Sequence, residues 1–434
     1  MVTNSALRGV LLAALTVASC SFFVSGAAAT PALDQAFGDG GFVTPTVFPH
    51  RKKFQTARAV ALQSDGKTVV PMTLPFAHGQ RARRPVIRLN TDGSRDRTYG
   101  SKGVAWVRAG GAPFITLRGA KTYADDSTLI WGEYSFSAQG EADGFFVARL
   151  SAQGVQDKKF GDRGARRFSL DIPGNDTDLV DVSPAADGGV IVAYNTYSLS
   201  RARDTLRIAR LSPDGSIVRS FGTNGTKSVA IDTRLDLGGF SVSRDSAYLL
   251  LHKNSDCFVR RFDLAGGGAQ DLTYGVGGDA RISGVESAAQ ESYCIGMSSS
   301  ESGAVVVHGE YFVEGARHSG FVSRLQPDGS PDASFGSSGL ATVESLENAY
   351  RSAALPDRGV ILGGACKSKT RNGCVAVLDQ SGVSVASFGR AGVLDVGKWV
   401  GPVQLTASGN AAAVLLLDED TRSYAQTRIV KLSL

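Results

Sequence analysis

The sequence predicts an all-β fold, a seven-bladed β-propeller built from four-stranded repeats. Three observations carry this prediction: a glycine-rich phrase that recurs, short alternating strands between its copies, and chain ends that complement each other. The phrase reads Phe/Tyr-Gly-x-x-Gly, and its copies start 53 to 62 residues apart, at Phe37, Tyr99, Phe160, Phe221, Tyr274, Phe335 and Phe388. A unit of this length accommodates four short strands, and a closed ring of such units is a propeller.

Each copy of the phrase predicts a tight corner between two strands, because glycine adopts the positive φ angles that side chains resist. Three residues before the aromatic, five copies carry an aspartate that is suited to accept hydrogen bonds from turn amides: Asp34, Asp96, Asp157, Asp271 and Asp332. Calcium loops are an alternative for these acids, but calcium needs six to eight oxygen ligands and the acids here are too sparse. A turn-stabilising role is therefore favoured.

Strands are predicted upstream of each corner. An alternating segment ends in a turn in "FVSRLQPDGS" from Phe321, and "ARAVALQSDGKTVV" (residues 57–70) predicts a hairpin turning at Asp65-Gly66. No 3.6-residue periodicity lasts beyond about two turns, so helices are not expected. The chain begins with a corner and its following strand and ends on "TRIVKLSL", a strand that normally precedes a corner. The N-terminal strand is therefore expected to complete the last blade and close the ring.

Residues 1–29 predict an export signal, and residues 30–434 a single propeller. Arg8 precedes an apolar run, and Ala27 and Ala29 are the small residues that signal peptidase prefers, so cleavage is expected before Thr30. "VASC" offers an alternative, a lipobox in which Cys20 is lipidated and becomes the N-terminus. Both readings predict a secreted, periplasmic or cell-envelope protein. No other apolar run reaches about 18 residues, so no transmembrane span is expected in the mature chain.

Four cysteines follow the leader, and an even number in an exported chain favours disulfide bonds. We expect Cys366 to pair with Cys374 across a hairpin, and Cys257 to pair with Cys294. Zinc is the alternative, but the sequence has no Cys-x-x-Cys pair and its five histidines are scattered. No cofactor or metal ion is expected.

The segments "LQPDGSPDASFGSSG" (residues 325–339) and "ALQSDGKTVV" (residues 61–70) resemble the delta-60 repeat of bacterial secreted and surface proteins. The resemblance extends over the chain from Leu33 onward. It is strong at residues 89–103, 211–225 and 325–339 and degenerate at residues 262–278. It implies an extracytoplasmic repeat propeller, and it implies no catalytic residues.

The formal charge of +5 is too small to indicate a nucleic-acid partner. Basic residues instead gather in two kinds of connection that vary between repeats. These connections should share one face of the disc, because successive connections of a four-stranded blade alternate between its faces. Repeat proteins often bind through such variable loops. The predicted binding residues are Arg51, Lys52, Lys53, Arg81, Arg83, Arg84, Arg201, Arg203, Lys367, Lys369, Arg371, Tyr134 and Tyr311.

The sequence favours an exported binding or scaffold module that engages a protein or an anionic surface polymer through these variable loops. The alternative is a propeller enzyme, a hydrolase or lyase acting on a sugar or lactone in the central channel. Its candidate acids are Glu133 in "WGEYSF" and Glu310 in "HGEYFV", which occupy the same place in two repeats. Repeat homology by itself explains that match, so the sequence predicts no catalytic residue and leans against an enzyme.

Overall fold

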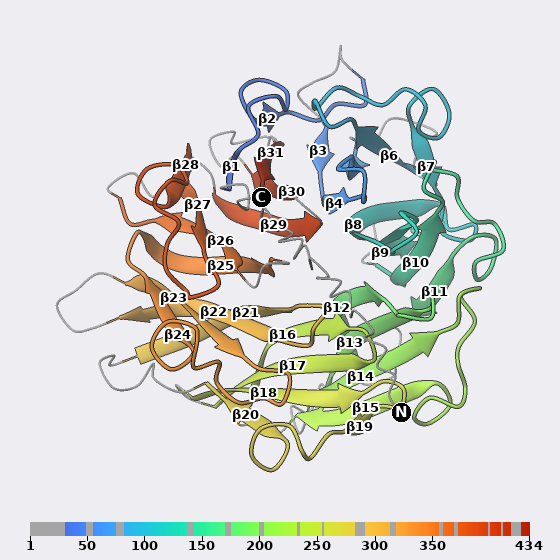
Figure 1. The fold of residues 1–434 in the computed structure, drawn as a ribbon. Helices are drawn as coiled ribbons and strands as arrows, with labels where there is room; N and C mark the ends of the chain where they lie inside the picture. Colours follow the sequence, from blue (N-terminus) through green and yellow to red (C-terminus); the bar gives the residue numbers. More distant parts are fainter. Residues whose placement is uncertain are drawn as a thin grey trace, which may run out of the picture.

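The computed structural model describes residues 31–48, 55–74, 82–137, 142–169, 175–198, 204–231, 235–253, 256–282, 291–312, 318–355, 359–368, 372–397, 400–408, 411–417 and 427–434. In these ranges the secondary structure consists of β-strands in seven antiparallel sheets. The sheets radiate around a common centre like the blades of a propeller (Figure 1). The predicted all-β, seven-bladed propeller is confirmed. None of the described residues forms a helix long and apolar enough to cross a membrane.

The first four blades follow one another along the chain. Blade 1 contains β3 (Thr56–Ala57), β4 (Ala61–Leu62), β5 (Thr68–Thr73), β6 (Arg84–Leu89) and β7 (Ala105–Val107). Blade 2 contains β8 (Phe114–Thr122), β9 (Thr128–Ser135), β10 (Gly144–Leu150) and β11 (Arg166–Ser169). Blade 3 contains β12 (Asn175–Pro184), β13 (Val190–Ser198), β14 (Asp204–Leu211) and β15 (Thr226–Ile231). Blade 4 contains β16 (Asp236–Ser243), β17 (Ser246–Lys253), β18 (Asp256–Asp263), β19 (Ala269–Gln270) and β20 (Asp279–Arg281).

The remaining blades repeat this order, and the last one takes strands from both ends of the chain. Blade 5 contains β21 (Glu291–Ser299), β22 (Val305–Phe312), β23 (Ser319–Leu325) and β24 (Leu340–Val343). Blade 6 contains β25 (Leu346–Ala354), β26 (Val360–Cys366), β27 (Gly373–Leu378) and β28 (Val393–Gly397). Blade 7 contains β29 (Val400–Ser408), β30 (Ala411–Leu417), β31 (Thr427–Ser433), β1 (Ala32–Leu33) and β2 (Phe42–Val43).

Pairing between the chain ends closes the ring, as predicted. Strand β1 pairs antiparallel with β31 through Ala32 opposite Ser433, and β2 pairs with the same strand through Phe42 opposite Val430. In Figure 1 the blue N-terminal strands accordingly lie beside the red C-terminal strands. The exposed edge that β31 would otherwise present is therefore covered by strands from the other end of the chain.

The hydrophobic core is divided among the contacts between blades. Each of seven buried clusters combines residues from two neighbouring blades, and the cluster between blades 7 and 1 includes Phe37, Met72 and Leu415. The middle strand β6 is buried along its whole length, including Arg84 and Arg88, because neighbouring blades cover both of its faces. Because each blade buries its sides only against its neighbours, stability depends on a complete ring.

The repeated phrase forms the corner between the third and fourth strands of each blade. Its aromatic residue is at most 3% exposed in all seven copies. The two glycines that define the phrase have positive φ in every copy, as in Gly100 and Gly103. The predicted role of the aspartates is confirmed: the Asp96 carboxylate accepts a hydrogen bond from the backbone amide of Thr98, and each of the other four acids accepts one from the residue two positions on.

A basic residue of the third strand, which the sequence analysis missed, anchors most corners. Arg324 donates to the Asp332 carboxylate at 2.8 Å, lies over the Phe335 ring, and donates to the carbonyl of Gln380 in the next blade. The same kind of anchor recurs at Arg88, Arg149, Arg261 and Lys431. The signal was present in the sequence as a basic residue just before a Leu or Phe near the end of the third strand.

Replacing Ala391 with glycine is expected to stabilise the propeller. Ala391 has φ 54°, and glycine occupies the same corner position in two other blades, at Gly40 and Gly277. A non-glycine residue in this left-handed region costs about 1–2 kcal/mol, part of which is offset by the extra freedom that glycine gives the unfolded chain. We expect the free energy of unfolding in urea to rise by about 0.5–1 kcal/mol.

The neighbouring corner glycine supplies the control for this change. Gly392 has φ +86°, and a Cβ at this position would meet the Ser384 Cβ at 2.8 Å. Gly392→Ala should therefore destabilise the protein. A loss of stability in Ala391→Gly would contradict the assignment of backbone strain to this corner.

Candidate functional site

The connections between strands divide the disc into two unlike faces. The hairpins between the first and second strands and the glycine-rich corners lie at one end of the strands, which we call the corner face. The connections between the second and third strands, and those between blades, lie at the other end, the variable face. Antiparallel order imposes this alternation, so the corner face repeats its chemistry while the variable face does not.

The structure describes five of the predicted binding residues: Arg83, Arg84, Tyr134, Tyr311 and Lys367. The others lie outside the described residues, as does the lipidation candidate Cys20; they are Arg51, Lys52, Lys53, Arg81, Arg201, Arg203, Lys369 and Arg371. Blades 1, 2, 5 and 6 therefore provide the described part of the candidate surface.

Arg83 stacks on an aromatic ring at the variable face of blade 1. Its guanidinium carbon lies 4.4 Å from the ring centroid of Trp106 in β7, and both residues are half-buried. Among the described residues, no carboxylate pairs with Arg83. A guanidinium over an aromatic face is attracted by the ring and keeps N–H groups that can bind an anion.

Arg84 does not share this surface. It is the first residue of β6, where it pairs with Val107, and only 3% of it is exposed. The expectation that its guanidinium serves the variable face is therefore corrected. The strand begins one residue after Arg83, and the alternation of side chains along a strand sends Arg84 to the interior.

Tyr134 of β9 belongs to a second cluster of rings and a cation in blade 2. Its ring meets Phe136 edge-on at 5.8 Å, and the Arg167 guanidinium lies 5.5 Å from Tyr134 and 5.6 Å from Phe136. Tyr134 is 7% exposed, whereas Phe136 is 58% exposed. The predicted tyrosine is thus the support of this cluster, and Phe136 and Arg167 are the members that reach solvent.

Tyr311 and Lys367 meet across the boundary between blades 5 and 6. The Tyr311 hydroxyl donates to Glu344 at 3.1 Å, and the Lys367 ammonium contacts the same carboxylate at 3.3 Å and donates to the Ser319 hydroxyl at 2.6 Å. Burial opposes ionisation of Glu344, but the hydrogen bonds from Tyr311 and Lys367 outweigh it and lower the pKa. Lys367 is therefore neutralised within the protein, which weakens its case as a contact for an anion.

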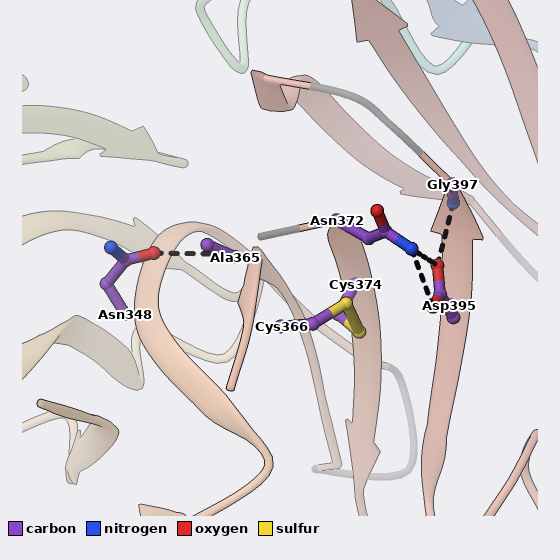
Figure 2. The surroundings of a disulfide bond; sticks show 7 residues. All are labelled: Asn348, Ala365, Cys366, Asn372, Cys374, Asp395 and Gly397. Atoms are coloured by element: carbon purple, nitrogen blue, oxygen red, sulfur yellow. Dashed lines mark hydrogen bonds between the residues drawn. A yellow bond between two sulfur atoms is a disulfide. The ribbon is translucent and has the colours of Figure 1, made fainter. Parts of the chain in front are cut away.

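Both predicted disulfide bonds are confirmed. Cys257 of β18 is bonded to Cys294 of β21, which ties blade 4 to blade 5. Cys366 and Cys374 join the ends of β26 and β27 at the variable face, with Cα atoms 5.1 Å apart. Figure 2 shows this bond beside Asn372, whose side-chain amide donates to Asp395.

Glu133 and Glu310 do not form a pair of catalytic acids. Arg118 binds both carboxylate oxygens of Glu133, at 2.9 and 2.8 Å, and Glu310 lies 3.3 Å from the imidazole of His318. The two acids belong to strands β9 and β22, three blades apart. Their matching positions therefore reflect the repeat, as the sequence analysis favoured.

The buried His308 should make the propeller sensitive to acid. It is 2% exposed, and its pKa is lowered from 6.5 to about 3 by burial and by the charge of Arg351, against an opposing effect of the Tyr350 backbone. Because the folded-state pKa is depressed, the stabilisation is complete above pH 6.5 and is lost as the pH falls toward 3. We expect the free energy of unfolding to fall by about 2 kcal/mol between about pH 7 and pH 5 from this residue.

Denaturant unfolding across this pH range measures the effect. His308→Leu should flatten the pH dependence, whereas His318→Leu should leave it in place because the His318 side chain is 46% exposed. Identical pH profiles for the wild type and His308→Leu would show that another group controls the acid response.

A comparison with protein families agrees with the propeller architecture. Residues 302–335 match a β-propeller domain of unknown function, DUF5122. A comparison with curated proteins finds no match. Among solved structures, the polysaccharide lyase Uly1 is 12% identical with a TM-score of 0.49, covering 92% of this chain and 94% of that one.

Two further solved structures are similar over most of the chain. A protein of unknown function from Dyadobacter fermentans is 11% identical with a TM-score of 0.41, covering 93% of this chain and 99% of its own. The β-propeller domain of the trilobed protease from Pyrococcus furiosus is 7% identical with a TM-score of 0.48, covering 87% and 93%. The propeller assignment stands on the strand pairing itself, and these likenesses assign no activity.

Proposed function

We propose that this protein is an exported binding module of the delta-60 type that holds an anionic surface polymer on its variable face. The observation that carries the proposal is Arg83, a cation stacked on Trp106 with no carboxylate partner among the described residues. A guanidinium in this setting has its planar N–H edge free for a carboxylate, sulfate or phosphate group.

The neighbouring blade supports the same interpretation. Phe136 presents an exposed ring beside the Arg167 guanidinium, which also lies 3.7 Å from the Asp162 carboxylate. A ring next to a cation is suited to a sugar ring that carries an acidic substituent. Blades 1 and 2 therefore form the proposed binding surface, with a polymer lying across both.

Export is part of this proposal. Two disulfide bonds need an oxidising compartment to form, and this agrees with a cleaved leader of residues 1–29 or a lipidated Cys20. The mass of the mature protein distinguishes the two routes, since one begins at Thr30 and the other at an acylated Cys20. A mature protein that retains its first residues in the cytoplasm would refute both.

Retention on immobilised polygalacturonate tests the binding function, with dextran as the uncharged comparison. The wild type should be retained by the acidic polymer alone and should elute as salt screens the contact. Arg83→Ser should weaken retention by about threefold to tenfold, the loss of roughly one charge-assisted hydrogen-bonded contact.

Arg219→Ser is the matched control, because Arg219 is an exposed arginine on the corner face. It removes the same charge from the opposite side of the disc, so it should be retained like the wild type. Equal losses of retention in the two variants would show that only the net charge of the protein matters. Retention of Arg83→Ser equal to the wild type at every salt concentration would place the site elsewhere.

A further inference from the structure

A cavity on the corner face is lined by charged and hydroxyl-bearing side chains that take no part in the proposed binding at the variable face. Its volume is about 580 Å³, and residues of the hairpins between the first and second strands of blades 2, 3, 4 and 5 line it. This volume is within the range of small-molecule sites in proteins. Tyr123, Asp125, Arg149, Ser243, Arg244 and Glu301 are among the residues that line it.

The cavity wall is held by hydrogen bonds between blades. The hydroxyls of Ser241 and Ser299 lie 2.7 Å apart, the Ser243 hydroxyl donates to the Ser300 carbonyl at 2.5 Å, and the Tyr123 hydroxyl donates to the Gly189 carbonyl at 3.1 Å. Each of these bonds joins two different blades. The hairpins are therefore fixed relative to one another before any ligand arrives.

The hydrogen bonds of Arg149 differ from those of the arginines at the same position in other blades. In blades 1, 3, 4 and 5 the corresponding arginine donates to a turn carbonyl of the next blade, as Arg88 does to Ala152. The hydrogen bond of Arg149 goes to Asp157 in its own blade, and none to the next turn is present among the described residues. This guanidinium lines the cavity instead. The pKa of Asp125 is lowered mainly by the hydrogen bond from the Ser127 hydroxyl and further by the charge of Arg149.

Arg244 reaches the cavity from a strained position. It forms the tip of the β16–β17 hairpin with φ 49°, a backbone conformation that glycine adopts at Gly66, Gly188 and Gly303 in other inner hairpins. A residue with a side chain is strained in this left-handed conformation. Its side chain is exposed and forms no ion pair among the described residues, so local structure does not account for an arginine here, whereas a ligand in the cavity does.

We propose that this cavity binds a small sugar acid, a monosaccharide that carries a carboxylate. Arg244, which forms no ion pair among the described residues, supplies the main positive charge for the carboxylate, and Arg149 adds to it although its guanidinium also binds Asp157. The carboxylates of Asp125 and Glu301 accept hydrogen bonds from sugar hydroxyls, and the Tyr123 ring offers an apolar face for the sugar ring. A ligand with both an anionic group and several hydroxyls fits this mixed lining better than an apolar or purely cationic one.

Isothermal titration with glucuronate and glucose tests this assignment. Glucuronate should bind the wild type at least tenfold more tightly than glucose. Arg244→Gly should reduce the glucuronate affinity at least tenfold and at the same time raise the melting temperature without ligand, because glycine relieves the positive φ. This combination separates a ligand contact from a structural role.

Asp125→Asn is the second variant. The Asp125 Oδ1 atom accepts hydrogen bonds from the amide and hydroxyl of Ser127, and asparagine keeps that acceptor, so the hairpin should survive while glucuronate affinity falls. Unchanged glucuronate affinity in Arg244→Gly, equal affinity for glucose, or no heat of binding in the wild type would each overturn the proposal. Arg83→Ser should bind glucuronate normally, so failure of the variable-face proposal leaves this result intact.

Discussion

Deletion of residues 30–46 is expected to abolish the cooperative unfolding transition of the whole propeller. The deletion removes β1, β2 and the buried Phe37, and it uncovers both the edge of β31 and the cluster between blades 7 and 1. Each blade is stabilised by its neighbours, so loss of the contact between blades 7 and 1 weakens the whole ring. Circular dichroism during heating should show loss of the sharp transition, and light scattering should show aggregation through the free edge.

A single substitution tests the contact between blades 7 and 1 with a smaller change. Phe37 is fully buried, and Lys431 of β31 lies 5.5 Å from its ring. Phe37→Ala should cost about 3–5 kcal/mol of unfolding free energy. Val276→Ala is the control, because Val276 is 91% exposed at the equivalent corner of blade 4 and should change stability little.

An unchanged melting curve after deletion of residues 30–46 would show that the end strands are dispensable.

Arg324→Ala is expected to destabilise the propeller by about 3–5 kcal/mol. The side chains of Arg324 and Asp332 are 4% and 2% exposed, so removing the guanidinium leaves a carboxylate buried without its cation. The same change removes the hydrogen bond to Gln380 in the next blade. Urea unfolding at neutral pH measures the loss.

Arg163→Ala and a double variant complete this experiment. The Arg163 side chain is 79% exposed in a loose contact with Asp162, so its loss should cost less than about 1 kcal/mol. Arg324→Ala combined with Asp332→Ala should cost less than the sum of the two single changes, because neither charge is then left buried alone. Additive losses would show that the two residues stabilise the corner independently.

The sequence by itself determined the repeat and therefore the architecture. Glycine at positions that need positive φ, such as Gly100 and Gly103, is a local requirement and is visible without any tertiary information. The pairing of Cys366 with Cys374 and of Cys257 with Cys294 was also predicted correctly, the first from its hairpin spacing. Closure of the ring was predicted because each end of the chain carried part of the same blade.

Only the tertiary structure decided how each charged residue is used. Arg83 and Arg84 are adjacent in the chain, yet one stacks on Trp106 at the surface and the other is buried, because strand register sends them to different sides. Lys367 was predicted as a binding residue, but the carboxylate of Glu344, which lies between β24 and β25, is 3.3 Å from its ammonium. The cavity beside Arg244 is formed by four blades that are far apart in sequence, and no local pattern encodes which hairpin tips converge once the ring closes.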